Sequence, residues 1–570
     1  MAKTGIFLCR CFGAIDGVVD LDALREKLGK IDSAVTVSVH DSLCLAENIN
    51  TTASLIRNTG MEKVLIGACS FLAKGEAVVN GLVQEDVERS AIGLVDLRES
   101  CAWIHANDPA NATLKAYDLI RMEIAALGYR QKSRDVAVRV RPEALVVGGG
   151  PAGLSAAAAL ARLGLRVHLL ERGASLGGML NLISRVYPSD EKAQDKIQSL
   201  TKEIGKNELI RVYPKGKITS VAGYAGDFKV RFSSSSGEER IRVGAVILAT
   251  GARIYLPDGL YGYGKLKNVI TQMELERQFV RGAVHTKGAV FIQCVGARNL
   301  ERPYCATLCC PASLKNAMRV KDENPDAEVF VLHRDIMMPG RVLEAYYRKA
   351  LAKGVQFIRY EEARPPQILG ENGVEGVAVH DVITGVTRNM KVDLAVLSTP
   401  LIPNNDNQHL AEKFGVQIDH HGFFKEIYPL HPLETRVEGV FICGSARWPV
   451  SSEQAMIQGE GAAVKAASLL GRERVRALSL SRVPGGKLGH ASVNEKSCTG
   501  CGNCVAVCPF DACTLQKVGR KFVSRVNKMR CKGCGNCVSA CLNGTIQLPE
   551  HDYRAVGGMI KYAFSEETLP

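Results

Sequence analysis

The chain has 570 residues, a formal net charge of +13 and a hydrophobic fraction of 46%. Its length predicts three or four domains of roughly 100–200 residues each, and its ordinary composition excludes a disordered, low-complexity chain. No apolar stretch is long and charge-free enough to predict a membrane span. The basic residues form no clustered stripe of the kind that binds nucleic acid, and the first residues predict a strand rather than a secretory signal.

Residues 1–135 are predicted to form a small α/β domain in which short strands alternate with helices. The expected strands are Thr4–Cys9, Val35–Val39, Lys63–Ala68 and Ala91–Leu97. The expected helices lie around residues 20–30, 46–58, 71–88 and 103–128. At or just past the strand ends stand five cysteines: Cys9, Cys11, Cys44, Cys69 and Cys101.

These five cysteines predict a 4Fe–4S site, because ligands bind at the carboxyl edge of an open α/β sheet. Four of them would ligate the cluster, with one of Cys9 and Cys11 surplus and Cys9 the expected one. The alternative is that they are buried cysteines in an apolar layer. Since cluster ligands must stay reduced, the cysteine usage favours a cytoplasmic protein.

Residues 136–285 are predicted to be the first part of an FAD-binding domain. A buried strand, Ala144–Val147, leads into Gly148-x-Gly150-x-x-Gly153, an alanine-rich helix and a second strand that ends at Glu171. The glycines would let the backbone approach a pyrophosphate at the helix N-terminus, and Glu171 would accept the ribose hydroxyls.

A glycine pair after the acidic residue and an ATG element after a buried strand favour FAD over NAD. Residues 396–475 are predicted to complete the domain, with a strand ending at Gly444 and a helix whose N-terminus lies under the flavin. The expected FAD contacts are Gly148, Gly150, Pro151, Ala152, Gly153, Glu171, Arg172, Gly177, Gly178, Met179, Ala249, Thr250, Gly251, Gly444, Ser445, Gln454 and Ala455.

Residues 286–395 are predicted to form a modified second nucleotide-type domain. Its first strand, Gly288–Cys294, is not followed by the second glycine cradle that NAD(P)H would need. Four cysteines stand there instead, and Pro311 is expected to begin a helix directly after them. The helix dipole would stabilise a negatively charged cluster, so a 4Fe–4S site is predicted at Cys294, Cys305, Cys309 and Cys310.

The alternative for this site is a set of free core cysteines, and a redox disulfide is disfavoured because no C-x2-C pair occurs here. Lys315 is expected one turn into the following helix. We hypothesise that Lys315 faces the isoalloxazine ring near N5 as a proton donor or an electrostatic stabiliser of reduced flavin. A lysine on an exposed helix face is the alternative.

The stretches Leu127–Pro142 and Gly471–Lys496 are predicted to be linkers, the second an exposed, mobile connector around residues 476–495. Residues 496–570 carry two C-x2-C-x2-C-x3-C runs of the bacterial two-cluster ferredoxin kind, in which the fourth cysteine ligates the other cluster. Cluster one is therefore assigned to Cys498, Cys501, Cys504 and Cys541. Cluster two is assigned to Cys531, Cys534, Cys537 and Cys508. Zinc is disfavoured because it takes two C-x2-C pairs.

From about residue 142 to 475 the chain resembles the thioredoxin-reductase-like flavoproteins. The chain also resembles the A-type subunit of heterodisulfide reductase. The motifs that carry this resemblance are the C…YC-x3-CC pattern with Lys315, the ATG element, the terminal double cysteine run, and the N-terminal elements CRC, LC, ACS and ESCAW. The implied fold is a Rossmann-like flavoprotein core with two dinucleotide-binding domains, an N-terminal α/β domain and a C-terminal α+β ferredoxin-like domain. The chain lacks the ferredoxin-like insertion of longer archaeal proteins, since Ser220–Val230 continues without cysteines.

The resemblance implies an FAD- and 4Fe–4S-containing electron-transfer subunit, with four clusters expected from the ligand count and the flavin as the site of electron bifurcation. It implies partners such as heterodisulfide-reductase B/C-like or other redox subunits, a ferredoxin-like or hydrogenase or dehydrogenase electron donor, and a homodimer within a larger complex. One alternative is an NAD(P)H-dependent flavin oxidoreductase resembling the glutamate synthase small subunit. The other is an electron-relay subunit that does not bifurcate.

Overall fold

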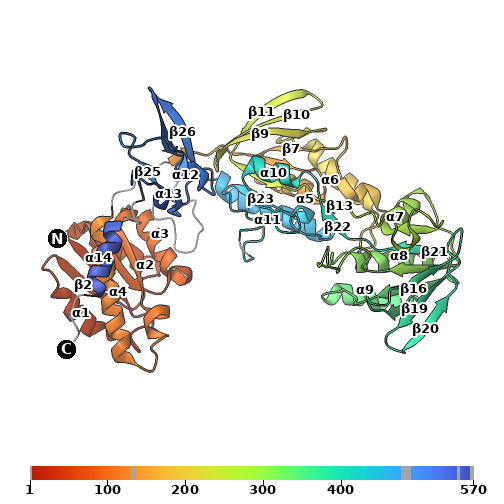
Figure 1. Ribbon diagram of the computed structural model, residues 1–570, viewed down its shortest axis with the longest axis horizontal. Coiled ribbons are helices and arrows are strands. Elements are labelled where there is room, and N and C mark those ends of the chain that lie inside the picture. Colours follow the sequence, from red (N-terminus) through yellow and green to blue (C-terminus); the bar gives the residue numbers. More distant parts are fainter. Residues whose placement is uncertain (1–2, 131–136, 428, 477–489, 549–552, 565–570) are drawn as a thin grey trace. The chain divides into compact units, whose positions relative to one another are not determined.

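The computed structural model describes residues 3–130, 137–427, 429–476, 490–548 and 553–564 (Figure 1). It divides into two units, one formed by Met1–Val138 with Val475–Pro570 and the other by Arg139–Arg474. None of the described helices is long and apolar enough to cross a membrane. The finer domain boundaries expected from the sequence stay predictions.

The N-terminal sheet is parallel throughout and has the strand order β2-β1-β3-β4. Its strands are β1 (Thr4–Cys9), β2 (Val35–His40), β3 (Lys63–Ala68) and β4 (Ile92–Asp96), as the sequence predicted. Because the chain runs from β1 outward to β2 and then returns to β3, the strand order reverses between β1 and β3. In open α/β sheets, ligands bind at such a switch point.

The helices of this domain are α1 (Leu21–Gly29), α2 (Ala46–Thr59), α3 (Glu76–Gln84) and α4 (Pro109–Tyr129). The helix expected from residue 103 begins later, at Pro109. Asp108 caps it by accepting a hydrogen bond from the amide of Asn111, and proline is favoured in the first turn. A short π-helix, Phe71–Gly75, precedes α3 where a continuous helix was expected.

The first sheet of the second unit is parallel, in the order β23-β12-β6-β7-β8. Its strands are β6 (Glu143–Val147), β7 (Arg166–Leu170), β8 (Ile210–Tyr213), β12 (Ala245–Leu248) and β23 (Val440–Ile442). The helices of this region are α5 (Pro151–Arg162), α6 (Ala193–Lys206), α10 (Asn407–Phe414) and α11 (Ser452–Leu470). An antiparallel sheet is formed by β9 (Lys217–Tyr224), β10 (Asp227–Ser234) and β11 (Gly237–Val243).

Helices α5 and α11 lie side by side (Figure 1). Gly459 of α11 makes this possible, since a Cβ atom there would lie 2.1 Å from the carbonyl oxygen of Ala152. The close approach brings the N-terminal parts of two helices from distant parts of the chain to the same region of the first sheet.

The second parallel sheet has the order β14-β21-β15-β16-β17. Its strands are β14 (Val269–Thr271), β15 (Gly288–Ile292), β16 (Glu328–His333), β17 (Gln356–Arg359) and β21 (Leu394–Leu397). Its helices are α7 (Gln272–Arg281), α8 (Cys309–Glu323) and α9 (Arg341–Ala352). A small antiparallel sheet contains β18 (Gln367–Leu369), β19 (Gly376–Asp381) and β20 (Val386–Met390), and a two-stranded ribbon pairs β13 (Ala252–Ile254) with β22 (Leu401–Pro403).

Two expectations for this sheet are corrected. Strand β15 ends at Ile292, and Cys294 beyond it has a positive φ of 62°, a left-handed conformation that ends extended pairing. Helix α8 begins at Cys309, so Cys309 and Cys310 form its first turn and Pro311 is its third residue. Proline is tolerated there because the first four helical amides have no partner within the helix. Lys315 consequently lies in the second turn.

The ferredoxin region is an internal repeat with two short helices, α12 (Asn503–Ala506) and α13 (Asn536–Ser539). Its strands are β25 (Ser492–Val493), β26 (Cys513–Val518), β27 (Lys521–Val526) and β28 (Ile546–Gln547). A terminal helix, α14 (Tyr553–Ala563), packs against α4. The predicted linkers include residues 131–136 and 477–489, which lie outside the described residues; β5 (Ala137–Arg139) and β24 (Arg474–Arg476) adjoin them.

Candidate functional site

The largest set of predicted site residues lines one cavity of about 380 Å³ in the second unit. The wall contains most of the expected FAD contacts, namely Gly148, Gly150, Pro151, Ala152, Glu171, Arg172, Gly178, Met179, Ala249, Thr250, Gly251, Ser445 and Ala455. Four others shape the wall from behind: Gly153, Gly177, Gly444 and Gln454. The three glycines let neighbouring parts of the chain pack closely against them, and Gln454 caps the N-terminus of α11.

The glycine loop after β6 has the geometry of a dinucleotide cradle. Gly148 has a φ of 112°, and a Cβ atom at Gly153 would lie 1.8 Å from the carbonyl oxygen of Gly148. By contrast, the space beside Gly150 at the start of α5 is open. An open cleft at a helix N-terminus, kept clear by glycines, fits a pyrophosphate. Glu171, expected to bind ribose, accepts hydrogen bonds from the amides of Gly149 and Gly173 at 2.6 and 2.5 Å.

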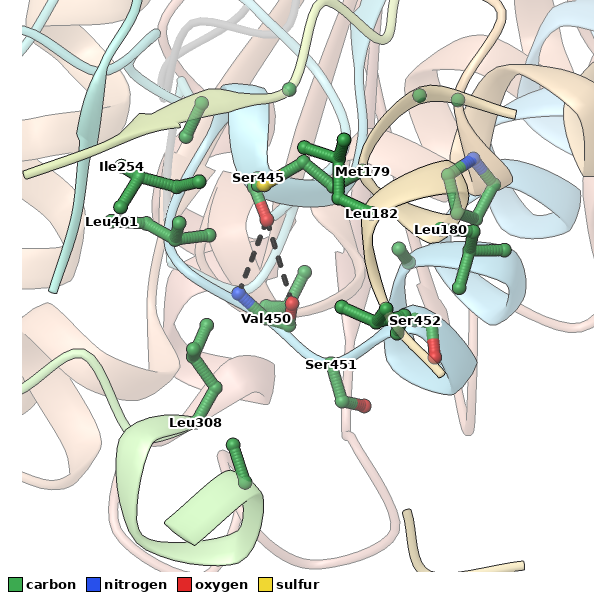
Figure 2. A pocket seen from close by; sticks show the side chains of 18 of the residues that line it. Met179, Leu180, Leu182, Ile254, Leu308, Leu401, Ser445, Val450, Ser451 and Ser452 are labelled. Carbon is green, nitrogen blue, oxygen red and sulfur yellow. Dashed lines mark hydrogen bonds between the residues drawn. The ribbon is translucent and has the colours of Figure 1, made fainter. Parts of the chain in front are cut away.

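The part of the cavity drawn in Figure 2 is lined mostly by apolar side chains. Four of them, Leu308, Ile254, Leu401 and Leu182, come from four segments of the chain, and an apolar wall of this kind would exclude water from a bound ring. Ser445 closes one side through hydrogen bonds with the backbone of Val450, both 3.4 Å long.

The N-terminus of α11 also reaches this cavity through Ser451 and Ser452. Ser451 and Gln454 form a capping box, in which the Ser451 hydroxyl accepts from the Gln454 amide at 3.1 Å. The remaining free amides and the positive end of the helix dipole favour negative charge nearby. The helix was predicted to lie under the flavin, and the position of its N-terminus on the wall of this cavity is consistent with that prediction.

Lys315 is buried, and the alternative of an exposed surface lysine is wrong. Its ammonium lines the cavity, forms an ion pair with Glu276 of α7 and donates a hydrogen bond of 2.9 Å to the carbonyl oxygen of Arg185. Burial lowers the pKa of Lys315, while Glu276 opposes that effect. Glu276 is itself fixed by the amide and hydroxyl of Ser184, at 2.9 and 2.8 Å.

Among the cavity residues that the sequence reasoning missed are Glu276, Gln272 and Asn316. The Asn316 amide donates to the side-chain oxygen of Gln272 at 2.7 Å, and its own oxygen Oδ1 is buried without a hydrogen-bond partner. An unpaired buried acceptor on the wall suits a donor group of a bound ring. Glu276 carried one usable signal, since it shares the buried face of α7 with Leu275 and Phe279.

Cys309 and Cys310 begin α8, Cys294 and Cys305 of the preceding loop are close to them, and Cys309 is part of the flavin cavity wall. Burial raises the pKa of Cys309 well above its usual value, and nearby Cys310, Cys294 and Cys305 raise it further. Burial likewise raises the pKa of Cys310 to about 12, with contributions from Cys294 and Cys305. Four thiolates this close would repel one another, and the positive iron core of a cluster would offset that repulsion.

The loop between β15 and α8 occupies the place of a nicotinamide cradle. Gly296 has a φ of 78°, and a Cβ atom there would lie 2.2 Å from the ring of Tyr255. The guanidinium of Arg302 lies over the same ring, 4.1 Å from its centroid. The space directly beside Gly296 is therefore taken by the Tyr255 ring, while Tyr255 and Arg302 also line a separate hollow of about 530 Å³.

In the N-terminal domain, three thiols gather at the switch point between β1 and β3. Burial raises the pKa of Cys9, with smaller contributions from Cys11 and Cys69, and Arg98 donates a hydrogen bond of 3.5 Å to the sulfur of Cys11. Cys101 instead donates to the carbonyl oxygen of Asp96 at 3.8 Å. Which four cysteines ligate stays a prediction, and this geometry weighs against Cys9 as the surplus one.

Cys44 stands apart from this group in its hydrogen bonding. It follows β2, and its sulfur lies 3.4 Å from the hydroxyl of Ser42. All five N-terminal cysteines thus occupy positions at or near the carboxyl edge of the sheet, as their spacing predicted.

In the ferredoxin region, the four cysteines assigned to cluster two line one small cavity: Cys508, Cys531, Cys534 and Cys537. This grouping includes the fourth cysteine of the other run, as the crossed assignment requires. A fifth thiol, Cys513, which the sequence reasoning left unassigned, lines the same cavity.

Two cysteines assigned to cluster one share a serine. Ser524 donates its amide to Cys498 at 3.4 Å, and its hydroxyl lies 3.1 Å from the sulfur of Cys504. The sulfur of Cys541 lies 3.2 Å from the hydroxyl of Thr545, and Cys501 is exposed.

No three His, Cys, Asp or Glu side chains of the described ranges converge as tightly as the ligands of a single metal ion.

Taken together, the glycine cradle, the apolar ring site and the two cysteine runs define an iron–sulfur flavoprotein with two dinucleotide-type domains. Residues 142–467 match the family model described as pyridine nucleotide-disulphide oxidoreductase, and residues 490–542 match the 4Fe-4S dicluster domain. The chain belongs to the pyridine nucleotide-disulphide oxidoreductase family. The predicted fold class, the FAD and 4Fe–4S cofactors and the assignment as an oxidoreductase are confirmed.

Curated relatives are similar over nearly the whole chain. The A-type iron-sulfur subunit of the CoB–CoM heterodisulfide reductase of Methanocaldococcus jannaschii is 28% identical, over 90% of this chain and 91% of its own. The A-type subunit of the H(2)/formate:CoB-CoM heterodisulfide,ferredoxin reductase of Methanococcus maripaludis is 28% identical, over 98% of each chain. The resemblance to the A-type subunit of heterodisulfide reductase is thereby confirmed.

Solved structures similar to this chain include two thioredoxin reductases. That of T. acidophilum is 18% identical with a TM-score of 0.42, covering 57% of this chain and 99% of that one. That of Lactococcus lactis is 19% identical with a TM-score of 0.41, covering 58% and 99%.

Proposed function

We propose that this chain is the FAD- and 4Fe–4S-containing electron-transfer subunit of a cytoplasmic heterodisulfide-reductase-like complex. The observation that carries the proposal is the position of Cys309 on the wall of the flavin cavity, together with three more thiols. A cluster held there would adjoin the flavin. Residues that would hold the flavin are the glycine cradle, Ser445 and the N-terminus of α11.

Bound FAD exchanges electrons in pairs, whereas 4Fe–4S clusters exchange them singly. The conversion between the two is the chemical reason to hold both in one chain. The proposed task of Lys315 is to hold or donate a proton at Nζ beside the ring, with Glu276 offsetting its charge. Asn316 would orient the ring through its free oxygen, and the apolar wall would exclude water.

Within this function we propose that the flavin splits electron pairs, sending one electron toward a ferredoxin-like acceptor near about −400 mV. The names of the relatives support a ferredoxin- or H2-linked heterodisulfide system. Expected partners are B/C-like or other redox subunits and a hydrogenase- or dehydrogenase-type donor, around a homodimer of this chain. If the proposal holds, the subunit turns over only within that complex.

The proposal is tested by asking which reductant reaches the flavin. The anaerobically purified chain, loaded with FAD, iron and sulfide, is mixed either with a reduced low-potential ferredoxin or with NADH or NADPH. We expect the ferredoxin to bleach the flavin and cluster absorbance, and the nicotinamides alone to leave the flavin oxidised. Bleaching by NADH or NADPH alone would establish the nicotinamide-dependent alternative instead.

Purification of the chain together with its untagged neighbours tests the complex. We expect redox subunits to accompany it in fixed ratio. A chain that purifies alone and turns over alone would contradict the proposed role within a complex.

A further inference from the structure

The two halves of the ferredoxin region differ at one buried position. Five residues beyond the last cysteine of the first run stands Cys513, and five residues beyond the last cysteine of the second run stands Ile546. Both side chains are 3% exposed, and each opens a strand, β26 and β28 respectively. In a repeated fold these are equivalent positions, so one half presents a thiol where the other presents a hydrocarbon.

The Cys513 thiol faces the ligands assigned to cluster two. It lines the cavity formed by Cys508, Cys531, Cys534 and Cys537. In that cavity its thiol lies within hydrogen-bonding reach of Cys508 and Cys537, and the amide of Ala512 next to it donates to the sulfur of Cys508 at 3.3 Å. The run spacing already supplies four ligands, which leaves Cys513 as a fifth thiol with a hydrogen atom to donate.

We propose that Cys513 tunes cluster two: its S–H group donates hydrogen bonds to the thiolates of Cys508 and Cys537 and raises the reduction potential of the cluster. An oxidised 4Fe–4S core with four thiolates carries a net charge of about −2, and reduction adds one further negative charge. A donor aimed at the ligand sulfurs stabilises the more negative state more strongly. Ile546 can give no such bond to cluster one.

The test is a reciprocal exchange of the two residues in the full, anaerobically loaded protein. Cys513→Ile gives the first half the residue of the second, and Ile546→Cys does the reverse. Cluster potentials are followed by EPR during a redox titration, with iron quantified in every sample. We expect Cys513→Ile to lower one midpoint potential and Ile546→Cys to raise another, each by a shift of up to about 59 mV, which is tenfold in the reduced-to-oxidised ratio for one electron.

Cys513→Ser is the conservative variant, because a hydroxyl can donate the same hydrogen bonds, and we expect it to keep the wild-type midpoint. An unchanged midpoint in Cys513→Ile with full iron content would overturn the proposal. So would loss of iron in Cys513→Ile and Cys513→Ala, because that would make the residue a ligand or a packing element rather than a tuning residue. The ligand assignment is tested separately by Cys531→Ser, which must lose iron whether or not Cys513 tunes the cluster.

Discussion

Lys315 and Glu276 form an ion pair that is almost completely buried, with 4% and 5% of their side chains exposed. They come from different helices, α8 and α7, and both side chains line the flavin cavity. A buried pair of this kind is costly to break, since removing one partner leaves an uncompensated charge away from water. It holds the lysine ammonium at a fixed place on the cavity wall.

Replacing Lys315 by Met is expected to lower the free energy of unfolding by about 3–5 kcal/mol, because Glu276 is left as an unpaired buried charge. It is also expected to shift the flavin potential to more negative values, since a positive charge beside the ring is lost. The double variant Lys315→Met with Glu276→Gln should recover much of the stability but not the potential. Denaturation and flavin redox titration measure the two effects, and a wild-type potential in both variants would exclude a role at the ring.

Adding a single methyl group to the glycine cradle, at Gly153, is expected to abolish most of the flavin binding. In Gly153→Ala, the new Cβ atom would meet the carbonyl oxygen of Gly148 at 1.8 Å, and a backbone contact of this kind cannot be relieved by a side-chain rotation. The purified variant is expected to contain less than about a tenth of the FAD of the wild type, a loss of at least about 1.4 kcal/mol in binding. Gly205→Ala, in open space within α6, is the matched control and should retain its flavin.

Removing one ligand of the predicted central cluster is expected to lower the iron content of the purified protein by a defined amount. Cys309→Ser is expected to remove about four of roughly 16 irons per chain, as judged from the ligand count. It should leave FAD content near one per chain, because the glycine cradle is untouched. Cys443→Ala is the control, since this buried cysteine is assigned to no cluster. Equal iron in the Cys309 variant and the control would remove the central cluster from the protein.

The N-terminal cluster can be mapped by comparing its cysteines one at a time. We expect Cys9→Ser and Cys69→Ser each to lose about four irons, because these thiols gather at the switch point with Cys11. Cys101→Ser should keep them, since Cys101 is hydrogen-bonded to the Asp96 carbonyl. Full iron in Cys9→Ser with a deficit in Cys101→Ser would reverse the assignment and restore Cys9 as the surplus residue.

The buried thiol of Cys443 is expected to lower the free energy of unfolding in alkaline solution. Burial raises its pKa to about 12 in the folded protein, whereas an exposed thiol ionises near about 8.5. Above that lower pH the unfolded state loses a proton that the folded state keeps, so the free energy of unfolding falls as pH rises, by at most about 1.4 kcal/mol per pH unit from this group. Urea midpoints of wild type and Cys443→Ala at pH 8 and pH 10 check this, and parallel decreases in both would contradict it.

Structural features that are set by residues close together in the sequence could be predicted from the sequence. The strand β1, the glycine cradle and the two cysteine runs could be predicted because each is encoded within about 20 residues. The predicted start of α8, at Pro311, is wrong by two residues, because proline fits any position of the first turn and does not mark the first one.

Contacts between residues far apart in the sequence could not be predicted from such local patterns. Glu276 is 39 residues from Lys315, and nothing in the local pattern joins them. The contact of Cys513 with Cys537 depends on the pairing of two halves of the ferredoxin fold. The burial of Lys315 could not be decided from the sequence either, because a lysine in an amphipathic helix is usually on its exposed face.

The packing of α14 on α4 joins two helices from distant parts of the sequence. Arg121 of α4 lies between the rings of Tyr117 and Tyr562, 5.3 Å from each centroid. These contacts span more than 400 residues of sequence, so the helical layer of the first domain is completed by a helix that follows the flavin domain in the chain. Contacts between segments so far apart in sequence carry a high loop-closure cost, so we expect the packing of α14 on α4 to form late in folding, after the flavin domain that separates the two helices in the chain.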